Sequence, residues 1–290
     1  MAGKNERQRR IAREKYRRQQ EIRMARRRQQ RKRGVIALSA VLGAALIASL
    51  LAVFLSGGTP KKHPTASASK SPSATPSATT VAEPAHHCTY TKTGTAARTV
   101  SLPSAAPDYT ASYQATINTN LGKIAVNLEN SKATCTVNSF VHLAEAGYFN
   151  NTQCHRLLTS GIYVLQCGDP YATASTKLTC SSTSKIGTGI PGYEFASENL
   201  TDAKYPAGTV AMANEGTATT NGSQFFIVYK DSTSGLGATY TPFGTVSSGL
   251  GIVQNVAKDG YSCQYTVSGQ SEGGAPKEKV IIDSVTIKKT

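Results

Sequence analysis

The clearest pattern of apolar and polar positions lies in the second half of the chain, where short runs alternate with a period of two. Residues 113–130 contain two such runs on either side of Leu121-Gly122, which predicts a β-hairpin. Further runs are CHRLL, IYVLQC, TVAMAN, SQFFIVY, TPFGTV and KVIIDSVTIKK. Many short strands with one or two helices favour a mainly β domain, either a closed barrel or a sandwich with helices covering its ends.

One segment between these runs has helical spacing. In TVNSFVHLAEAGYF, apolar residues recur at helical intervals between Val137 and Ala144. Thr134 or Thr136 is expected to cap the N-terminus, and Gly147 lies just past the C-terminal end. The segment therefore predicts one helix among the strands.

The run SQFFIVY carries a polar residue in an unexpected place. Gln224 shares a face with Phe226, where a strand that enters a core would have an apolar residue. Because a buried amide without partners costs free energy, Gln224 is either exposed or part of a site. We expect Phe225, Ile227 and Tyr229 to face the interior. Gln224 and Phe226 would then line an outward-facing groove.

Two other predicted strands carry polar residues where a barrel wall would favour apolar ones. Arg156 lies in CHRLL, and Gln166 lies in IYVLQC on the same face as Val164. Together with Gln224 and Phe226, they predict an apolar groove bordered by one guanidinium and two amides.

Charge is distributed unevenly along the chain. Residues 1–33 hold 15 of the 32 Lys and Arg and 3 of the 17 acidic residues, whereas the remainder has 17 basic and 14 acidic residues. Residues 35–55 contain no charge over 21 positions, which is about the length of a transmembrane helix. The positive-inside rule then places the basic tail, residues 1–34, in the cytoplasm and the rest of the chain outside.

Two alternatives to this anchor agree less well with the sequence. A cleaved signal peptide usually has an apolar region of roughly 7–15 residues, and no A-x-A site precedes the linker here. Basic tails can also bind nucleic acid, but the adjacent apolar span favours attraction to anionic lipid headgroups instead. We therefore expect an uncleaved, single-pass anchor in the cell membrane, with an extracellular folded domain.

The region after the anchor divides into three parts. Residues 56–87 are rich in Pro, Ser, Thr and Ala and predict a disordered linker, residues 88–112 predict an extended arm, and residues 113–290 form the folded domain. All six cysteines lie beyond the anchor, and their even number predicts disulfides whose pairing the sequence leaves open. They are Cys88, Cys135, Cys154, Cys167, Cys180 and Cys263.

Metal binding and thiol catalysis are both poorly supported by the cysteine spacing. The chain has no C-x-x-C pair and no histidine spaced with a cysteine as zinc sites require, so no metal or other cofactor is expected. Cys154 and His155 are adjacent, but adjacent strand residues point to opposite faces, which argues against a thiol nucleophile activated by this histidine.

The candidate residues stand in blocks that resemble a known family. In chain order these blocks are TNLGKIAVNLENSKATCTVNSFVHLAEAGYFNNTQCHRL, VLQCGDP, PGYEFASENL, GTVAMANEG, TNGSQFFI and PFGTV. Over essentially all of residues 113–290 the sequence resembles cyclophilin-type peptidyl-prolyl cis-trans isomerases, and its anchored, cysteine-bearing form is similar to those of actinobacteria. The resemblance implies a closed eight-stranded antiparallel β-barrel capped by two α-helices, with the site on the outer wall.

The resemblance also assigns roles to individual residues. It implies that Arg156 is the catalytic arginine and that Phe226 and Gln166 assist it. The residues that it implies for binding the proline-containing substrate are Tyr163, Val164, Ala213, Asn214, Gln224, Leu236 and Tyr240.

The sequence departs from the family pattern near these residues. Two extra residues, within TSGIY, lie between Arg156 and Gln166. Gly235 stands where many members have a tryptophan that donates a hydrogen bond to cyclosporin, and Tyr240 stands where many have a histidine. We therefore expect weak cyclosporin binding with activity retained. The loop of residues 171–189 is longer than usual, and its role is open.

Two functions fit this site. The first is an isomerase that acts on Xaa-Pro segments of exported proteins and assists their folding at the outer face of the membrane. The second is a proline-peptide-binding chaperone module with weak or no catalysis. A more remote reading is a surface protein that uses the domain as a spacer. Retention of Arg156 and Phe226 favours the enzyme, because binding alone does not require a cation aimed at the proline nitrogen.

Overall fold

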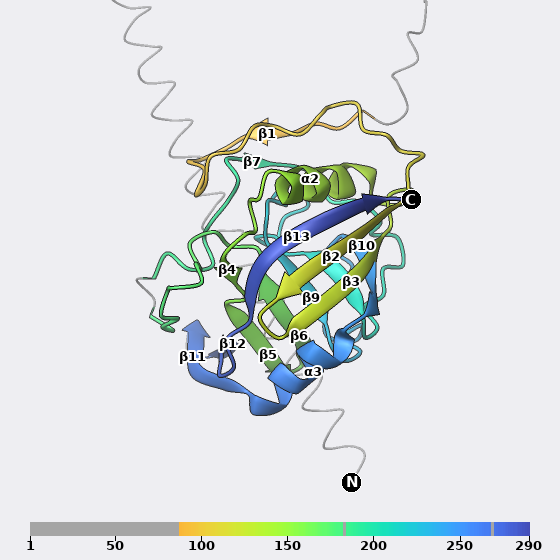
Figure 1. Ribbon diagram of the computed structural model, residues 1–290. Coiled ribbons are helices and arrows are strands. Elements are labelled where there is room, and N and C mark those ends of the chain that lie inside the picture. Colours follow the sequence, from red (N-terminus) through yellow and green to blue (C-terminus); the bar gives the residue numbers. More distant parts are fainter. Residues whose placement is uncertain (1–86, 182–183, 268–269) are drawn as a thin grey trace, which may run out of the picture. The chain divides into compact units, whose positions relative to one another are not determined.

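The computed structural model describes residues 87–290 apart from 182–183 and 268–269 (Figure 1). These residues belong to one compact unit that spans Glu83–Thr290. The predicted basic tail, transmembrane helix and nearly all of the predicted linker lie outside the described residues. Within the part that is described, no helix has both the length and the apolar character needed to cross a membrane.

The described residues form a mainly β fold with two helices. The helices are α2 (Thr134–Glu145) and α3 (Leu250–Asp259). The strands are β1 (Thr91–Lys92), β2 (Tyr113–Thr119), β3 (Gly122–Leu128), β4 (Thr152–Gln153), β5 (Arg156–Ser160), β6 (Ile162–Cys167), β7 (Tyr193–Glu194), β8 (Thr209–Met212), β9 (Phe225–Val228), β10 (Pro242–Ser248), β11 (Tyr261–Val267), β12 (Gln270–Pro276) and β13 (Ile281–Lys289).

Most of these strands belong to one antiparallel sheet with the order β11-β12-β5-β6-β9-β8-β10-β3-β2-β13-β4. β2 and β3 pair in continuous register, so the predicted hairpin is confirmed. The pairing order begins at β11 and ends at β4, and it does not by itself form the closed ring that the sequence predicts. The mainly β class with two helices is confirmed.

The predicted helix is confirmed as α2, which begins at Thr134, but the prediction of a threonine cap is wrong. Ala133 occupies the N-cap and makes no side-chain cap hydrogen bond. Instead, the carboxylate of Glu198 accepts hydrogen bonds from the backbone N–H groups of Cys135 and Thr136, at 3.1 and 2.7 Å. A negative charge at this end of a helix is favourable, so a residue distant in sequence replaces the local cap.

The strands β6, β8 and β9 separate two apolar clusters. The larger cluster fills the interior and contains Leu165, Val210, Met212, Phe225 and Ile227, whereas a smaller cluster on the opposite face contains Val164, Tyr205, Ala211, Phe226, Val228 and Leu236. Tyr229 also belongs to the interior cluster. The predicted alternation of faces from Phe225 to Tyr229 is therefore confirmed.

Three disulfides cross-link the described residues. They are Cys88–Cys135, Cys154–Cys167 and Cys180–Cys263, and the described residues contain no free cysteine. This pairing makes a thiol nucleophile at Cys154 impossible in the oxidised protein.

The segment before β2 is bound firmly to the rest of the domain. β1 pairs with β7, and Cys88 is joined to Cys135 in α2, so that this segment passes over α2 (Figure 1). Arg98 donates hydrogen bonds to the carbonyl groups of Gly147, Tyr148 and Asn150 just after the helix. Residues 88–112 therefore form part of the folded unit in this structure.

Candidate active site

A row of four residues crosses four neighbouring strands on the outer face of the sheet. Arg156 on β5 lies opposite Gln166 on β6, Gln166 lies opposite Phe226 on β9, and Phe226 lies opposite Ala211 on β8. Residues that are directly opposite in neighbouring strands project from the same face and are close enough to interact. The register therefore brings the predicted guanidinium, amide and aromatic ring together.

The apolar part of the site is the smaller cluster on the same face. Phe226 is only 4% exposed and packs edge-on against Tyr240, with 5.5 Å between the ring centroids. Val164 and Leu236 are also buried in this cluster, and Ala213 and Tyr240 pack at its edge. This arrangement places an apolar cluster beside Arg156 and Gln166.

The two glutamines of the site are bonded to each other. Gln166 Nε2 donates to Gln224 Oε1 at 2.9 Å, and Gln224 Nε2 donates to the carbonyl oxygens of Gly187 and Gly189, each at 3.1 Å. The Gln224 amide thus has partners at both ends, which resolves the question raised by its place in the strand. It neither projects freely into solvent nor carries an unsatisfied burial cost.

Not every residue implied by the resemblance joins this group. Tyr163 belongs to the other side of β6, where its ring lies 6.0 Å from that of Tyr229 and under the ammonium group of Lys230 at 4.6 Å. It follows Ile162 and precedes Val164, and neighbouring residues of a strand face opposite sides. The structure therefore does not bring Tyr163 into the apolar cluster with Val164.

Asn214 lies beyond the end of β8 and orders the neighbouring loop. Its Nδ2 donates to the carbonyl of Thr239 at 2.7 Å, and its Oδ1 accepts from the N–H of Gly216 at 2.9 Å. The N–H of Ala213 donates to the carbonyl of Gln224. The side chain of Asn214 therefore supports the loop that carries Tyr240, and a role for its backbone in holding substrate stays a prediction.

The structure has no room for a side chain at position 235, where many family members have a tryptophan. A Cβ atom added to Gly235 would overlap the carbonyl oxygen of Gly161 and would lie 2.6 Å from Cγ2 of Ile162. Gly161 forms the turn between β5 and β6, and Ile162 is the first residue of β6. The two extra residues of the sequence lie in this region. The longer turn therefore occupies the space of a side chain at position 235, a coupling that sequence reasoning missed.

His155 is the most strongly perturbed basic group near the row. Its side chain is 2% exposed, and neither ring nitrogen has a hydrogen-bond partner within the described residues. Burial, and secondarily the charge of Arg156, lower the pKa of His155 from 6.5 to about 3. The ring is therefore neutral at physiological pH.

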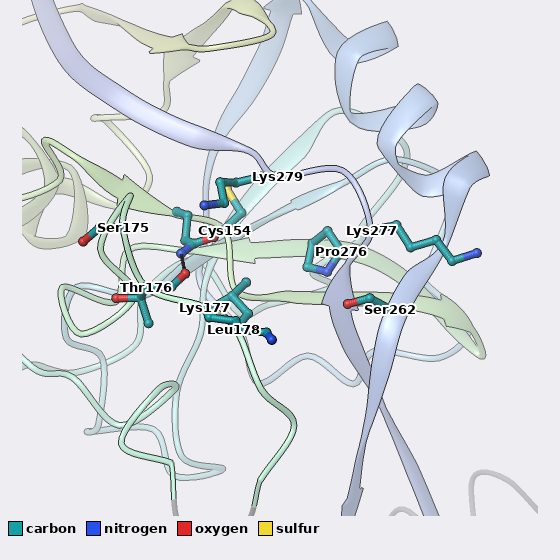
Figure 2. Close-up of a pocket in the computed structure, with 10 residues that line it drawn as sticks. Cys154, Ser175, Thr176, Lys177, Leu178, Ser262, Pro276, Lys277 and Lys279 are labelled. Atoms are coloured by element: carbon teal, nitrogen blue, oxygen red, sulfur yellow. Dashed lines mark hydrogen bonds between the residues drawn. The ribbon is translucent and has the colours of Figure 1, made fainter.

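A cavity of about 290 Å³ lies apart from the row (Figure 2). Its lining residues are Gln153, Cys154, Ser175, Thr176, Lys177, Leu178, Ser262, Pro276, Lys277 and Lys279, and none of the predicted site residues is among them. Elsewhere, no group of three or more His, Cys, Asp or Glu residues in the described part of the chain could hold a metal ion.

The class of protein is defined by this fold and by comparison with known families. The family model described as cyclophilin type peptidyl-prolyl cis-trans isomerase/CLD matches residues 114–287. The chain therefore belongs to the cyclophilin-type peptidyl-prolyl cis-trans isomerase family.

Particular relatives agree with this assignment. The chain is 41% identical over 208 residues to the probable peptidyl-prolyl cis-trans isomerase B of Mycobacterium leprae, covering 66% of this chain and 63% of that one. It is 42% identical over 208 residues to the protein of the same name from Mycobacterium tuberculosis strain H37Rv, covering 66% and 60%. The matched region thus spans less than two thirds of either relative.

A solved structure also resembles the domain. A cyclophilin-type peptidyl-prolyl cis-trans isomerase from Cryptosporidium parvum aligns with a TM-score of 0.50 and 25% sequence identity. The alignment covers 62% of this chain and 99% of that one. The likeness supports the cyclophilin-like fold of the described residues.

Proposed function

We propose that the outer face of β5, β6, β8 and β9 catalyses cis-trans isomerisation of Xaa-Pro peptide bonds. The observation that carries the proposal is the row in which Arg156, Gln166 and Phe226 lie opposite one another beside an apolar cluster. Membership of the isomerase family and the names of the mycobacterial relatives support it.

The physical basis is selective stabilisation of a twisted amide. Rotation about a prolyl peptide bond costs about 18–20 kcal/mol because amide resonance must be broken. In the twisted state the proline nitrogen gains a lone pair, which the guanidinium of Arg156 can bind and which the planar ground state does not offer. Phe226 and its apolar neighbours would hold the proline ring, while Gln166 fixes the flanking backbone.

We also propose that the sheet closes into an eight-stranded barrel. Only two residues separate β4, which pairs with β13, from β5, which pairs with β6. The N–H of Cys154 donates to the carbonyl of Val280, and the N–H of His155 donates to that of Gln166. Residues 152–160 then act as one bent strand, and the closing set is β2, β3, β4 with β5, β6, β8, β9, β10 and β13.

The place of action is proposed from the sequence outside the described residues. Residues 35–55 would anchor the protein in the cell membrane, residues 1–34 would lie near anionic lipids in the cytoplasm, and the domain would act outside on exported proteins. The three disulfides support an oxidising compartment. Protease protection of the N-terminal tail in sealed inverted and right-side-out vesicles would test this orientation.

The geometry at Gly235 supports weak cyclosporin binding with retained activity. The turn at Gly161 and Ile162 leaves no room for a tryptophan at this position, so its hydrogen bond to the drug cannot form. Inhibition of the isomerase by cyclosporin at submicromolar concentration would contradict this proposal.

The alternative function is a module that binds proline-containing segments with little or no catalysis. The same apolar cluster and glutamine pair would serve such a role. The two functions differ in the need for Arg156, because ground-state binding has no twisted nitrogen to stabilise.

The test is the exchange rate of an Xaa-Pro peptide measured by NMR with the full chain in a mild detergent. We expect catalysed exchange by the wild type and a loss of at least about 100-fold in kcat/KM for Arg156→Ala, since each factor of ten corresponds to about 1.4 kcal/mol. Arg156→Lys should recover only part of it, because a lysine lacks the fixed fork of donors.

The matched control is Arg98→Ala. Arg98 is the other arginine among the residues that the structure describes. Arg98 binds backbone carbonyls beyond α2, so its loss should lower stability and leave the exchange rate unchanged. Equal rates for wild type and Arg156→Ala would overturn the mechanism, and peptide binding without catalysed exchange by the wild type would favour the alternative function.

A further inference from the structure

We propose that Asp169 is a positioning residue of the isomerase site, acting on Gln166 through the backbone of residues 187–189 and the side chain of Gln224. The inference rests on the proposed function. It also gives a role to the long loop of residues 171–189, which neither the family membership nor the row of site residues explains.

Asp169 holds the two ends of the long loop together. The side chain of Asp169 is fully buried, at 0% exposure, and lies two residues beyond the end of β6. Its Oδ1 accepts from the N–H of Tyr171 at 2.8 Å, and its Oδ2 accepts from the N–H of Gly187 at the other end of the loop. One carboxylate therefore joins the two ends of the long loop.

The close approach of the loop to Asp169 requires glycine. A Cβ atom added to Gly189 would overlap Asp169 Oδ1, and Gly187 has a φ of +88°, a conformation that residues with a side chain rarely adopt. The backbone around position 188 is thus wrapped against the carboxylate. Burial raises the pKa of Asp169, while the N–H groups of this backbone lower it, in keeping with a desolvated group that depends on the loop.

The loop is linked to the two glutamines by hydrogen bonds. The carbonyl oxygens of Gly187 and Gly189 both accept from Gln224 Nε2. Because the two amide hydrogens are directed to the loop, Oε1 is the end of Gln224 that faces Gln166, and it accepts from Gln166 Nε2. The loop therefore fixes which way both amides point.

The orientation of the Gln166 amide bears on the reaction itself. Gln166 lies opposite both Arg156 and Phe226, so the orientation of its amide determines what it offers to the substrate backbone. With Nε2 directed to Gln224, Oε1 is the end left to accept a hydrogen bond from a substrate N–H. Loss of Asp169 would release this orientation without removing any group that touches the substrate.

Two further contacts hold the loop and its start in place independently of Asp169. Cys180 is joined to Cys263 in β11, so the middle of the loop stays tethered when Asp169 is changed. Ser223 Oγ also bonds the carbonyl of Gly168 at 2.8 Å, which holds the residue before Asp169. An Asp169 variant should therefore loosen the 187–189 end of the loop selectively.

The experiment is a double-mutant cycle on the full chain in a mild detergent, with Asp169→Asn, Gln224→Ala and the double variant. Each single variant should lower kcat/KM by roughly three- to tenfold, the effect of one lost hydrogen bond. The double variant should lose no more than Gln224→Ala alone, because both changes break one chain of contacts. The side-chain amide signals of Gln166 should also shift in Asp169→Asn, although the two residues are not hydrogen-bonded.

The matched control is Glu198→Gln, since Glu198 also accepts from two backbone N–H groups but at the start of α2. It should lower stability and leave kcat/KM unchanged. The inference is overturned if Asp169→Asn behaves in the same way, or if its effect multiplies with that of Gln224→Ala.

A second variant keeps the inference testable if Asp169→Asn does not fold. Gln224→Leu removes the link between loop and site, and unchanged kcat/KM in this variant would overturn the inference. In that case a strong effect of Arg156→Ala would still leave the proposed function standing. Failure of the wild type to catalyse exchange would instead overturn the proposed function itself.

Discussion

The inner and outer faces of β6, β8 and β9 are built from alternate residues of the same strands, yet they differ in kind. On the inner face, Phe225 is fully buried and packs against Phe140 and Phe149 at 5.5 and 5.7 Å between ring centroids. On the outer face, Phe226 contacts Tyr240 and lies in register with Gln166. The inner face is apolar throughout this region, whereas the outer one mixes apolar residues with charge and amides.

The difference indicates which face serves folding and which serves function. An aromatic core fills space from all sides and needs no polar neighbour. The outer cluster is instead bordered by groups that must be held by hydrogen bonds, such as the Gln166–Gln224 pair. We expect these groups to act on a ligand, so two adjacent phenylalanines should respond very differently to the same substitution.

The largest effect is expected on the inner face. Phe225→Ala removes a ring that is enclosed by other aromatic rings, and it should lower the free energy of unfolding by about 3–5 kcal/mol. The molecules that remain folded should keep most of their isomerase activity. Urea unfolding monitored by circular dichroism measures the free energy of unfolding. A smaller loss of stability for Phe225→Ala than for Phe226→Ala would contradict the expected difference between the two faces.

The next largest effect is expected on the outer face. Phe226→Ala should lower kcat/KM at least tenfold, equivalent to about 1.4 kcal/mol of transition-state binding, because the proline ring loses its main apolar contact. Its cost in stability should be smaller than that of Phe225→Ala. Peptide exchange rates and urea unfolding of the same sample would show whether the two properties separate in this way.

The pH dependence of stability tests whether His155, the neighbour of Arg156, is sealed from solvent. His155 follows the interior residue Cys154, and a Cβ atom at Gly187 would lie 3.9 Å from its Nε2. Its folded pKa of about 3 lies below the ordinary 6.5, so the unfolded chain binds the extra proton between these values. The free energy of unfolding should therefore fall as pH decreases through this window, by up to about 1.4 kcal/mol per pH unit.

The contribution of His155 is isolated by comparison with His155→Gln. Asp169, whose pKa is raised, contributes in the opposite direction, since its folded form holds a proton that the unfolded form has lost. Urea unfolding of wild type and variant from pH 7 to pH 4 gives the difference. Parallel curves for the two proteins would show that His155 is not sealed from solvent.

An effect on stability alone is expected at the edge of the outer cluster. Gly235→Ala should cost about 1–3 kcal/mol through overlap with the backbone of Gly161, and Gly237→Ala, which meets nothing within 4 Å, should be nearly neutral. Thermal unfolding of both variants measures the contrast. Equal stability of the two variants would mean that the longer turn does not occupy the position of the missing tryptophan.

The sequence was sufficient for those features that depend on local pattern. The period of two in SQFFIVY predicts which side of β9 carries Phe226, and the blocks around Arg156 and Gln166 predict that these residues belong to one site. The register of β5, β6 and β9 then brings them into one row. Local alternation also explains why Tyr163 does not join Val164 in the apolar cluster.

Other features depend on contacts between distant segments, which a single sequence does not reveal. Glu198 caps α2 from a position far along the chain, in place of the predicted threonine. The disulfide pairs are separated by 47, 13 and 83 residues, so cysteine spacing could not select them. The pairing of β11 with β12, and the bond from Asp169 to Gly187, are likewise set by tertiary packing.

The most direct test asks which face of β6, β8 and β9 meets a prolyl peptide. Methyl-labelled full chain would be titrated with an Ala-Pro-containing peptide and followed by NMR. We expect shifts and exchange broadening for the outward methyl groups of Val164, Val228 and Leu236, with little change for the inward Val210 and Ile227. Unchanged outer methyl groups, with shifts confined to the inner residues or to Leu178 of the separate cavity, would contradict it.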